Sequence, residues 1–541
     1  MSKRNSSKKR GKTAGLDIFS LIRALISVCL LVLAYSIGAA PFVSILILIL
    51  AALISGFDII LAAVENALKR KDYFSSQTLI VISAAASFCV GCYIESIVML
   101  AVYQISASLL AFAVKKTRVG LYDSVSESNA EGYARLRSIL NSPAASYNTV
   151  KDKYMPYFEL FSKATLIVGI LFAIAVPFLT NMTYVMSIRR GCMLIAASVP
   201  VSALAALPLY SLAGLSHSAE YDVFVKNAKT LEKLGDLSTV IYDKNGVFTD
   251  GDPKLVSINS PVLDNESFLR LAAYTAYNSS QRFVSSIVRA YSGDIIAEYI
   301  TSFNDVCGCG MEAVIHGNHL LLGTQELFSA RGINLPESEK KSGYILYLTI
   351  EHSYIGSLTL KENVNPYAES VISDLAALGG IKSVMMTDDG AEVSEKLSSA
   401  LKIDELYYEC SGDEKSGIVR ESKSQMSDGS MLMYVSAKDQ EPHSSADIDA
   451  KVGRSLGNAD ILMSSIGLFG LPVAYVSACR MRRLSIENLI FTSVVKLILI
   501  VLALTGSVTL WFIVLVDFAS SIIGVLSTWR MTSENRKEEN I

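Results

Sequence analysis

The chain has 541 residues, of which 51% are hydrophobic and 18% are charged, and its mean hydropathy is +0.39. This composition excludes an ordinary soluble enzyme, because soluble globular chains carry about 25% charged residues. The formal net charge of −3 provides no basic field, so we expect no nucleic-acid partner.

Apolar runs long enough to cross a bilayer lie near both ends of the chain. A membrane-spanning helix needs about 20 largely apolar residues. By the positive-inside rule, the basic residues before the first run place the N-terminus in the cytoplasm, and an even number of spans places the C-terminus there too. The sequence therefore predicts a multi-pass protein of the cell membrane in contact with lipid. The eight expected spans are near 18–38, 42–63, 75–92, 94–114, 161–180, 190–212, 483–505 and 508–529.

A soluble insert separates the sixth and seventh predicted spans. Residues 239–242 form a short apolar run, and "KSVMMTDDG" and "SMLMYVSAKD" repeat the pattern of apolar residues followed by polar and acidic ones. Segments of helical character over 391–401 and 413–423 lie between the runs. Alternating strands and helices predict a parallel α/β sheet, which binds ligands beyond the carboxyl ends of its strands.

Asp243 follows the first of these strands, within "VIYDKNGVFTDG". A carboxylate at this edge of a sheet is placed to attack a phosphoryl group. An aspartate in a tight turn that also contains a glycine is the simpler alternative. Position alone leaves both interpretations open.

The surrounding residues add a family resemblance. "AKTLEKLGDLSTVIYDKNGVFTDG" resembles the segment of P-type cation pumps that ends in the phosphorylation motif D-K-T-G-T-x-T. Asp243, Lys244, Gly246 and Thr249 match this motif, whereas Asn245 and a valine replace two threonines. The resemblance implies that Asp243 is the phosphoryl acceptor and a magnesium ligand, with Mg²⁺ and ATP as cofactors.

Two later segments extend the resemblance. "VMMTDDG" is similar to the T-G-D motif of the family through Thr387 and Asp389. "SGDEKSGIVRE" is similar to the P-x-D-K segment through Lys415. The resemblance implies that Thr387 and Lys415 are catalytic residues that hold the phosphate.

The membrane segments are similar to one branch of this family. Residues 53–109 and 487–523 resemble spans of bacterial pumps that export zinc and cadmium. Lys496 and Asp517 lie within spans, at positions where that branch carries a lysine and a metal-binding aspartate. The resemblance implies Zn²⁺ or Cd²⁺ as the transported ion, whereas a structural ion pair is the alternative, since charges within a bilayer usually pair or line a pathway.

Two further acidic residues, Asp58 and Glu95, lie in or near spans, either in an ion path or as interfacial or paired residues. Neither interpretation is favoured by the sequence.

The residues between the strands include a glycine-rich stretch, "GCGMEAVIHGNHLLLG", which resembles the ATP-binding stretch of the family through Gly308, Gly310 and Gly323. Turns of a hairpin are the alternative explanation. Arg282 and Phe283 stand where the family has its adenine-contacting His-Pro motif, so we expect weakened ATP binding.

Three motifs of the family are altered. Val199, Pro200 and Val201 replace the Cys-Pro-Cys that presents thiolate ligands to soft metals. Residues 115–160 are too few for an actuator domain, and the chain contains no T-G-E motif. Ser436 stands where the magnesium motif begins with an aspartate, which leaves Asp439 as its carboxylate ligand.

The eight cysteines are scattered rather than arranged as a disulfide framework. Cys307 with Cys309, and Cys89 with Cys92, have spacings that fit a soft metal, but packing is the simpler explanation for both pairs.

We therefore expect a multi-span α-helical membrane protein of eight spans, with a cytoplasmic α/β haloacid-dehalogenase-like domain and an α+β nucleotide-binding insert. The expected parts are a basic tail (1–15), spans one to four (16–114), an actuator remnant or linker (115–160), spans five and six (161–212), a phosphorylation domain (213–253 and 359–470), a nucleotide-binding domain (254–358), spans seven and eight (483–529) and a C-terminal tail (530–541).

Three functions remain open at this stage. The first hypothesis is a pseudo-pump that keeps the scaffold and residual nucleotide or phosphate binding, and that acts as a sensing subunit or with a protein partner. The second is an active exporter of divalent metal cations that works through an Asp243 phosphoenzyme. The third is a membrane-tethered phosphatase, although Asn245 replaces the general acid of that superfamily.

Overall fold

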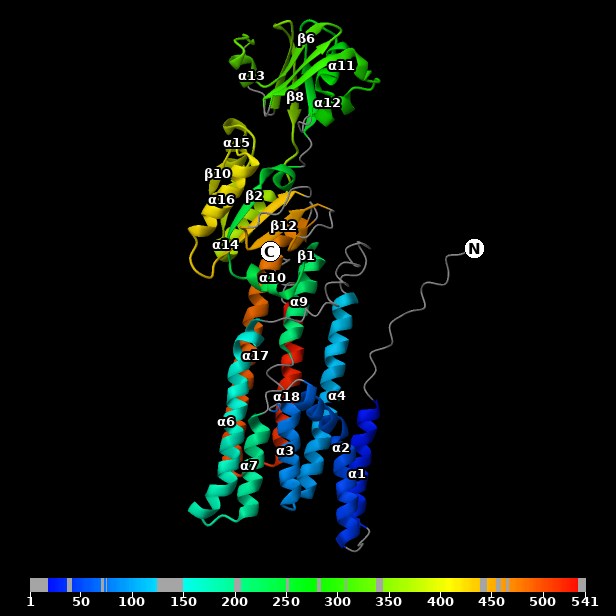
Figure 1. The fold of residues 1–541 in the computed structure, drawn as a ribbon, viewed down its shortest axis with the longest axis vertical. Coiled ribbons are helices and arrows are strands. Elements are labelled where there is room, and N and C mark those ends of the chain that lie inside the picture. The colour runs from blue at the N-terminus through cyan, green and yellow to red at the C-terminus, as the bar shows by residue number, and fades with distance from the viewer. Residues whose placement is uncertain are drawn as a thin grey trace, which may run out of the picture. The chain divides into compact units, whose positions relative to one another are not determined.

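The computed structural model describes residues 18–36, 41–69, 73, 75–123, 149–198, 206–249, 253–279, 284–306, 309–336, 344–437, 445–453, 459–463 and 467–533. Two compact units are present (Figure 1). The helical unit contains Met1–Glu220, Asn227–Gly235 and Val476–Ile541, and the α/β unit contains Tyr221–Lys226 and Asp236–Tyr475.

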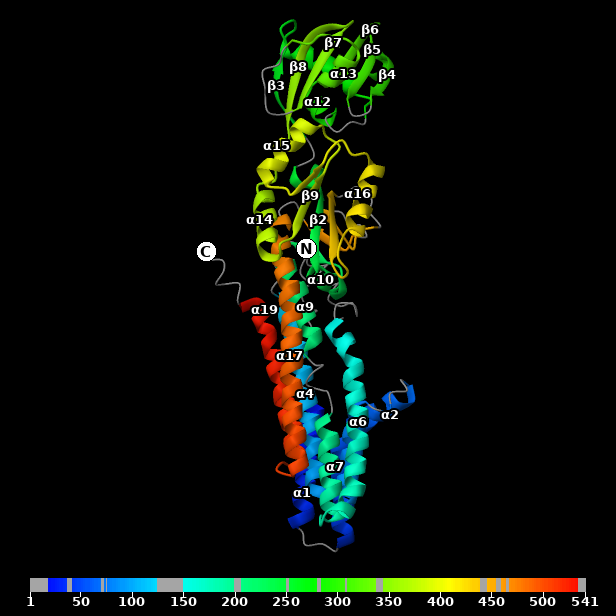
Figure 2. The ribbon, with the colours of Figure 1, turned by 90° about the vertical axis from the view of Figure 1, so that its left-hand side faces the viewer.

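Long helices packed side by side make up the helical unit (Figures 1 and 2). Helix α4 packs against α1, α2 and α18, and α7 packs against α3 and α6. The helices are α1 (Ile18–Ser36), α2 (Pro41–Lys69), α3 (Ser76–Cys89), α4 (Tyr93–Asp123), α6 (Thr149–Leu179), α7 (Tyr184–Ser198), α9 (Leu207–Glu220), α10 (Ala228–Leu234), α17 (Leu471–Thr505), α18 (Leu510–Leu526) and α19 (Arg530–Ser533).

Five helices of the described part of the chain are long and apolar enough to cross a membrane. Two shorter apolar helices cover Ile22–Ser36 and Gln77–Cys89. These findings agree with a membrane protein of several spans, while the number eight stays a prediction. Within the predicted actuator remnant or linker, α4 continues to Asp123 and α6 begins at Thr149. The five candidate spans are Pro41–Lys69, Tyr93–Phe112, Glu159–Leu179, Gly467–Thr505 and Leu510–Trp529.

Small residues bring α6 and α7 into backbone contact. A Cβ atom on Gly191 would lie 2.6 Å from the carbonyl oxygen of Gly169 and 3.3 Å from the Cβ of Ala173. Membrane helices gain little from burying apolar side chains against each other, because lipid is equally apolar, so close van der Waals packing has to hold them together. Glycine at both positions allows this approach.

Charged residues in the helical unit form pairs between helices. Arg23 on α1 donates to Asp58 on α2 over 2.6 Å, and Gln104 on α4 donates to the second oxygen of Asp58 over 3.1 Å. Arg189 on α7 donates to Glu95 on α4 over 2.9 Å. Asp58 and Glu95 are therefore both paired with arginines. A paired residue was one of the two interpretations that the sequence left open.

A mostly parallel seven-stranded sheet forms the first part of the α/β unit, in the order β1-β13-β12-β11-β2-β9-β10. Among the described strands of this sheet, only β1 pairs in the antiparallel direction. Three of these strands and the helices α15 and α16 cover the segments that the sequence predicted. The elements are β1 (Val223–Val225), β2 (Leu237–Asp243), β9 (Lys382–Met386), β10 (Glu405–Tyr407), β11 (Met431–Ala437), β12 (Ile448–Val452), β13 (Ile461–Met463), α14 (Ala368–Gly379), α15 (Ala391–Leu401) and α16 (Gly412–Ser424).

Apolar side chains fix one helix on one face of this sheet. Ile241 of β2, Leu432 and Tyr434 of β11 and Val419 of α16 belong to one buried cluster. Ser411 starts α16 with a capping box, because its side chain accepts from the Glu414 backbone while the Glu414 carboxylate accepts from the Ser411 backbone. The first turn of α16 is thereby fixed in place.

A six-stranded antiparallel sheet forms the second part, in the order β3-β8-β7-β6-β5-β4. Helices α11 and α12 pack on it through a buried cluster that includes Phe268 and Ile287. The elements are β3 (Lys254–Asn259), β4 (Ile300–Val306), β5 (Gly310–Ile315), β6 (Asn318–Gly323), β7 (Tyr344–Ile350), β8 (Ser353–Lys361), α11 (Asn265–Ala276), α12 (Val284–Ala290) and α13 (Gln325–Ala330).

The contact between α6 and α7 generates a stability prediction. Gly191→Ala is expected to lower the midpoint of thermal unfolding in detergent, because its new methyl group would overlap a backbone carbonyl that can move only with the helix. Overpacking of this kind costs about 1–3 kcal/mol. Gly417→Ala in α16 is the control, since its Cβ meets nothing within 4 Å and alanine favours a helix. Equal midpoints for the two variants would contradict the proposed close packing.

Candidate functional site

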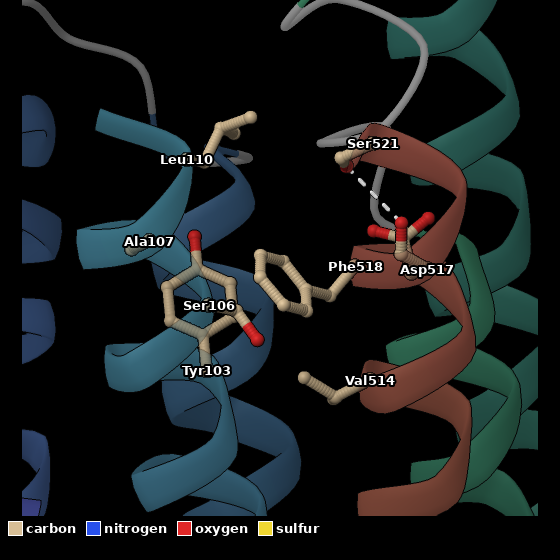
Figure 3. A pocket seen from close by; sticks show the side chains of 8 residues that line it. All are labelled: Tyr103, Ser106, Ala107, Leu110, Val514, Asp517, Phe518 and Ser521. Carbon is tan, nitrogen blue, oxygen red and sulfur yellow. Dashed lines mark hydrogen bonds between the residues drawn. The ribbon is translucent and has the colours of Figure 1, made fainter. Parts of the chain in front are cut away.

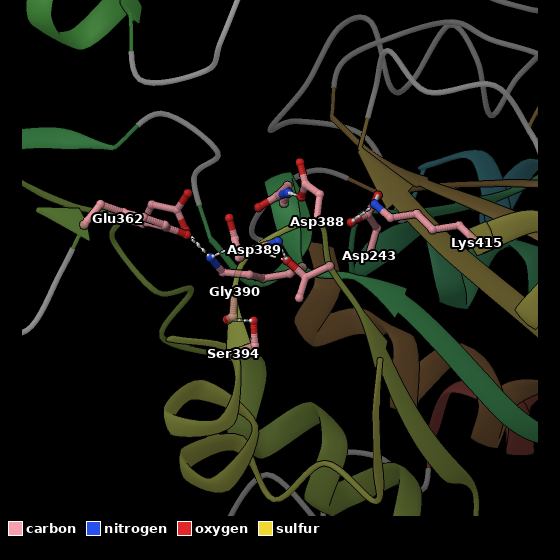
Figure 4. Close-up of polar contacts among 11 residues, drawn as sticks. Asp243, Glu362, Asp388, Asp389, Gly390, Ser394 and Lys415 are labelled. Carbon is pink, nitrogen blue, oxygen red and sulfur yellow. Dashed lines mark hydrogen bonds and ion pairs between the residues drawn. The ribbon is translucent and has the colours of Figure 1, made fainter. Parts of the chain in front are cut away.

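Asp243 is the last residue of β2, at the carboxyl edge of the seven-stranded sheet, and it is completely buried. Lys415, in the first turn of α16, places its Nζ 3.2 Å from each carboxylate oxygen (Figure 4). Tyr434, on the neighbouring strand β11, also hydrogen-bonds to the Asp243 side chain. The geometry thus brings Asp243 and Lys415 together from positions far apart in the sequence.

A second lysine lies between two carboxylates. Lys244, directly after Asp243, is 1% exposed, and its Nζ forms ion pairs with Asp389 and, over 2.8 Å, with Glu362. The same Nζ donates to the Tyr344 hydroxyl over 2.6 Å. Glu362 and Tyr344 were not expected from the sequence, because no motif surrounds them and only the packing of β7 and the segment after β8 brings them here.

Thr387 and Asp389 form a compact turn after β9. The Thr387 hydroxyl donates to the Asp389 carboxylate over 3.0 Å and accepts from the Asp389 backbone N–H over 3.1 Å. Thr387 is completely buried and Asp389 is 8% exposed. Since β2 and β9 are neighbours with Asp243 opposite Met386, Thr387 follows at the same edge of the sheet as Asp243.

The turn after Asp243 requires a glycine. Gly246 has φ +77°, and a Cβ atom there would lie 2.6 Å from the Cβ of Ala437. The Asn245 side chain donates to Asp388 over 2.5 Å. Asp243 itself is a buried strand residue rather than an exposed turn residue, so the turn interpretation applies to its neighbours and not to the carboxylate.

Burial and charge act together on the tyrosine beside Asp243. Burial raises the pKa of Tyr434, and the negative charges of Asp243 and Asp449 raise it further. The Tyr434 hydroxyl therefore stays protonated at physiological pH and donates a hydrogen bond to the Asp243 carboxylate. Lys415 and Tyr434 together hold this carboxylate in one orientation.

Magnesium, the cofactor implied by the family resemblance, fits the described residues poorly. The two oxygens of Asp243 face the Lys415 ammonium group, and Ser436 offers a hydroxyl in place of a carboxylate. The Ser436 Oγ is buried without a hydrogen-bond partner. The described residues contain no group of three or more His, Cys, Asp or Glu able to hold a metal, and Asp439 lies outside them.

The glycine-rich stretch is accounted for by strand packing at two positions. Gly310 and Gly323 are opposite each other in β5 and β6, and a Cβ atom on Gly310 would lie 2.3 Å from the Leu322 carbonyl oxygen. These contacts favour the structural alternative at both positions, whereas ATP binding there stays a prediction. Gly308, Cys307, Arg282 and Phe283 lie outside the described residues.

Lys496 and Asp517 meet inside the helical unit. The Lys496 Nζ on α17 donates to Asp517 on α18 over 2.8 Å and to the Ala197 carbonyl over 3.5 Å. The side chains of Lys496 and Asp517 are 4% and 14% exposed. The structural ion pair, which the sequence left open as the alternative to a site for the transported ion, is therefore present.

Asp517 also lines a cavity of about 30 Å³ between α4 and α18 (Figure 3). Hydroxyl groups of Tyr103, Ser106 and Ser521 line it as well, so the side-chain polar atoms around it are all oxygens. The segment Val199 to Val201 lies outside the described residues. Cys192 is buried in α7 and is not part of this cavity.

The cysteine pairs provide no metal cluster within the described segments. Among the described residues, Cys89, Cys92 and Cys309 form no disulfide. None of them belongs to a group of three potential ligands among the described residues.

Comparison with known proteins gives consistent similarities. No family model matches the chain. A cadmium-, zinc- and cobalt-transporting ATPase of Bacillus subtilis (strain 168) is 24% identical over 384 residues, which cover 69% of this chain and 54% of that protein. A zinc-transporting ATPase of Synechocystis sp. is 23% identical over 352 residues, covering 64% and 48%. The chain thus spans about half the length of the curated relatives it matches.

Two solved structures share the fold. A crystal structure of a zinc-transporting PIB-type ATPase in an E2.Pi state superposes with a TM-score of 0.62 at 18% identity, covering 95% of this chain and 99% of that chain. A crystal structure of a zinc-transporting PIB-type ATPase in a different state gives a TM-score of 0.53 at 17% identity, covering 94% and 99%. Membrane helices combined with α/β domains are therefore common to this chain and to those structures.

The buried pair of Asp243 and Lys415 generates a prediction. Lys415→Met is expected to speed hydrogen exchange of β2 and α16, because it leaves a buried carboxylate without its charge partner, a change that costs about 3–5 kcal/mol. The double variant Asp243→Asn with Lys415→Met should recover much of the protection. Exchange is measured by mass spectrometry on the full chain in lipid.

The matched control is Lys402→Met, which removes an exposed lysine whose partner is Glu369. Exposed pairs contribute about 0–1 kcal/mol, so its exchange should resemble that of the unmodified chain. Unchanged exchange in Lys415→Met would refute the role of this pair in holding α16 on the sheet.

Proposed function

We propose that the chain is a member of the heavy-metal branch of P-type ATPases. Support comes from the similarity to cadmium- and zinc-transporting ATPases and from the shared fold. In this proposal Asp243 is the phosphoryl acceptor position, Thr387 and Lys415 hold a phosphate group, and the seven-stranded sheet is a haloacid-dehalogenase-like phosphorylation domain on the cytoplasmic side of the cell membrane.

Within this family the chain acts as a pseudo-pump with residual phosphate or nucleotide binding. The observation that carries this conclusion is the environment of Asp243: its carboxylate is completely buried, hydrogen-bonded to Lys415 and Tyr434, and next to a serine where the family motif has an acidic magnesium ligand. Phosphoryl transfer depends on neutralising developing charge with a metal ion. A pocket that lacks that ligand binds phosphate but transfers it poorly.

The linker between α4 and α6 supports the same conclusion. Only residues 124–148 separate the end of α4 from the start of α6, and the chain contains no T-G-E motif. In an active pump an actuator domain carries this motif and assists hydrolysis of the phosphoenzyme. A pseudo-pump that senses a ligand or serves a protein partner does not need this step.

An active metal pump is the second candidate, and one arrangement favours it. Asp243, Thr387, Asp389 and Lys415 gather at one edge of the sheet, as an active phosphorylation site would need. Lys496 with Asp517 provides a charged pair in the expected ion path. A tethered phosphatase has less support, because Asn245 is engaged by Asp388 and an amide cannot act as a general acid.

The donor atoms near Asp517 bear on the transported ion of that second candidate. Zinc and cadmium favour thiolate and imidazole ligands, whereas the described cavity offers a carboxylate and hydroxyl groups. The lack of a thiolate or imidazole among the described lining residues is a further reason to prefer the pseudo-pump over a zinc or cadmium exporter.

The two candidates are separated by phosphoenzyme formation. The full chain in lipid receives labelled ATP and magnesium, with zinc or cadmium titrated, and the acid-stable label on the protein is measured. We expect no metal-stimulated turnover, because Ser436 replaces one acidic magnesium ligand of the motif and the actuator motif is missing. Asp243→Asn is the variant that identifies the labelled residue, and Asp264→Asn, an exposed helix cap on α11, is the matched control.

Label that turns over with metal, persists in Asp264→Asn and disappears in Asp243→Asn would refute the pseudo-pump. Label that forms on Asp243 without turnover would agree with the missing actuator motif. Absence of label under every metal condition would exclude the active exporter.

A further inference from the structure

The sheet edge beside Asp243 carries another buried lysine. Ser436 of β11 is opposite Lys451 of β12 in the parallel register. Because Val435 is opposite Tyr242 of β2, the next residues, Ser436 and Asp243, are neighbours at the end of these strands. Residues in register on adjacent strands point to the same face of a sheet. Asp243, Ser436 and Lys451 therefore form one row, which we name the edge row.

The edge row lies on the face that α16 covers. Tyr434 and Ile241 occupy the row one step deeper and belong to the same buried cluster as Val419 of α16. Lys415 reaches Asp243 from this helix. Lys415 thus reaches the edge row from the helix, while Lys451 belongs to the row through its place on β12.

The lysines near the edge row are buried, so water weakens their electrostatic interactions only slightly. Lys451 is 6% exposed, Lys415 is 9% exposed, and Ser436 is completely buried. The Ser436 Oγ has no hydrogen-bond partner. A hydroxyl group in the middle of the row, which can both donate and accept, is therefore unused. A buried hydroxyl without a partner is costly unless a ligand or water satisfies it. The row therefore points to a ligand with hydrogen-bonding oxygens.

Asp449 explains how Lys451 is tolerated in the sheet. It lies two residues earlier on β12, on the same face, and is 8% exposed. Neither of its carboxylate oxygens has a hydrogen-bond partner. Burial raises the pKa of Asp449, and the positive charge of Lys451 opposes this rise. The opposite charges of Asp449 and Lys451 attract each other, which lowers the cost of burying both residues in the sheet.

The charges near the edge row are balanced, so the row lacks the excess of carboxylates that a divalent cation requires. Asp243 and Asp449 bring two negative charges, and Lys415 and Lys451 bring two positive ones. An entering Mg²⁺ would meet two ammonium groups as well as the two carboxylates, while a phosphate group could pair with the ammonium groups and accept from the Ser436 hydroxyl.

We propose that Lys451 takes the place of a divalent cation at this edge, so that the Asp243 pocket binds a phosphate group without magnesium. This inference rests on the proposed function, because it assumes that the Asp243 pocket is a phosphate site. The simpler alternative is that Lys451 only neutralises Asp449.

The test measures binding of inorganic phosphate to the full chain in lipid nanodiscs by equilibrium dialysis with labelled phosphate. Each titration is done twice, with millimolar magnesium and with a chelator. We expect dissociation constants that agree within about two-fold, because no step of binding needs the metal. Lys451→Met is expected to raise the dissociation constant for phosphate at least about ten-fold under both conditions. This factor corresponds to the loss of one charge-assisted hydrogen bond.

Two further variants separate binding from folding. Asp449→Asn with Lys451→Gln keeps the buried pair uncharged, so the sheet should stay folded while phosphate binding is lost. Lys382→Met removes a lysine at the opposite, amino-terminal edge of the same sheet, where Lys382 pairs with Glu405, and should bind like the unmodified chain. Hydrogen exchange of β12 reports whether each variant is folded.

Each outcome has one meaning. Magnesium-independent binding that is lost in both Lys451 variants supports the inference. Binding that requires magnesium, or that survives in Lys451→Met, overturns the inference but leaves the phosphate pocket of the proposed function in place. No binding to the unmodified chain under either condition overturns both the inference and the residual phosphate binding.

Discussion

The α/β unit depends on one buried ion pair, between the Asp243 carboxylate and the Lys415 ammonium group. A fully buried carboxylate is stable only with a partner in good geometry. This requirement fixes α16 over β2 and orients its first turn, which the capping box at Ser411 holds in place. Tyr434 adds a hydrogen bond to the same carboxylate. The central strand, the covering helix and the candidate site are therefore positioned by the same contact.

In the helical unit, acidic side chains are likewise paired with basic ones. Asp58, Glu95 and Asp517 pair with Arg23, Arg189 and Lys496, and each pair joins two helices. A charge inside a bilayer costs a few kcal/mol unless it is compensated, so these pairs act as specific contacts between apolar helices. The pair formed by Lys496 and Asp517 differs because it borders a cavity lined by hydroxyl groups. It remains the best candidate for an ion path.

The Asp243 pocket combines retained and altered features of one chemistry. The residues proposed to hold a phosphate group lie together, whereas among the described residues Ser436 stands where the family motif has an acidic magnesium ligand. Lys244 further reduces the negative charge, because it forms ion pairs with Asp389 and Glu362. Such a pocket suits anion binding better than metal-assisted transfer, and it connects the proposed pseudo-pump with the inferred role of Lys451.

The sequence alone determined the apolar helices, the strands β2, β9 and β11, the helices α15 and α16, and the motif residues Asp243, Thr387 and Lys415, because hydrophobic periodicity and short motifs are local properties. It did not fix the number of spans, since length and hydropathy select only five helices among the described residues. Only the tertiary structure placed Tyr344 and Glu362 on Lys244 and aligned Lys451 with Asp243. These contacts depend on strand register and on packing between distant segments, which no local pattern encodes.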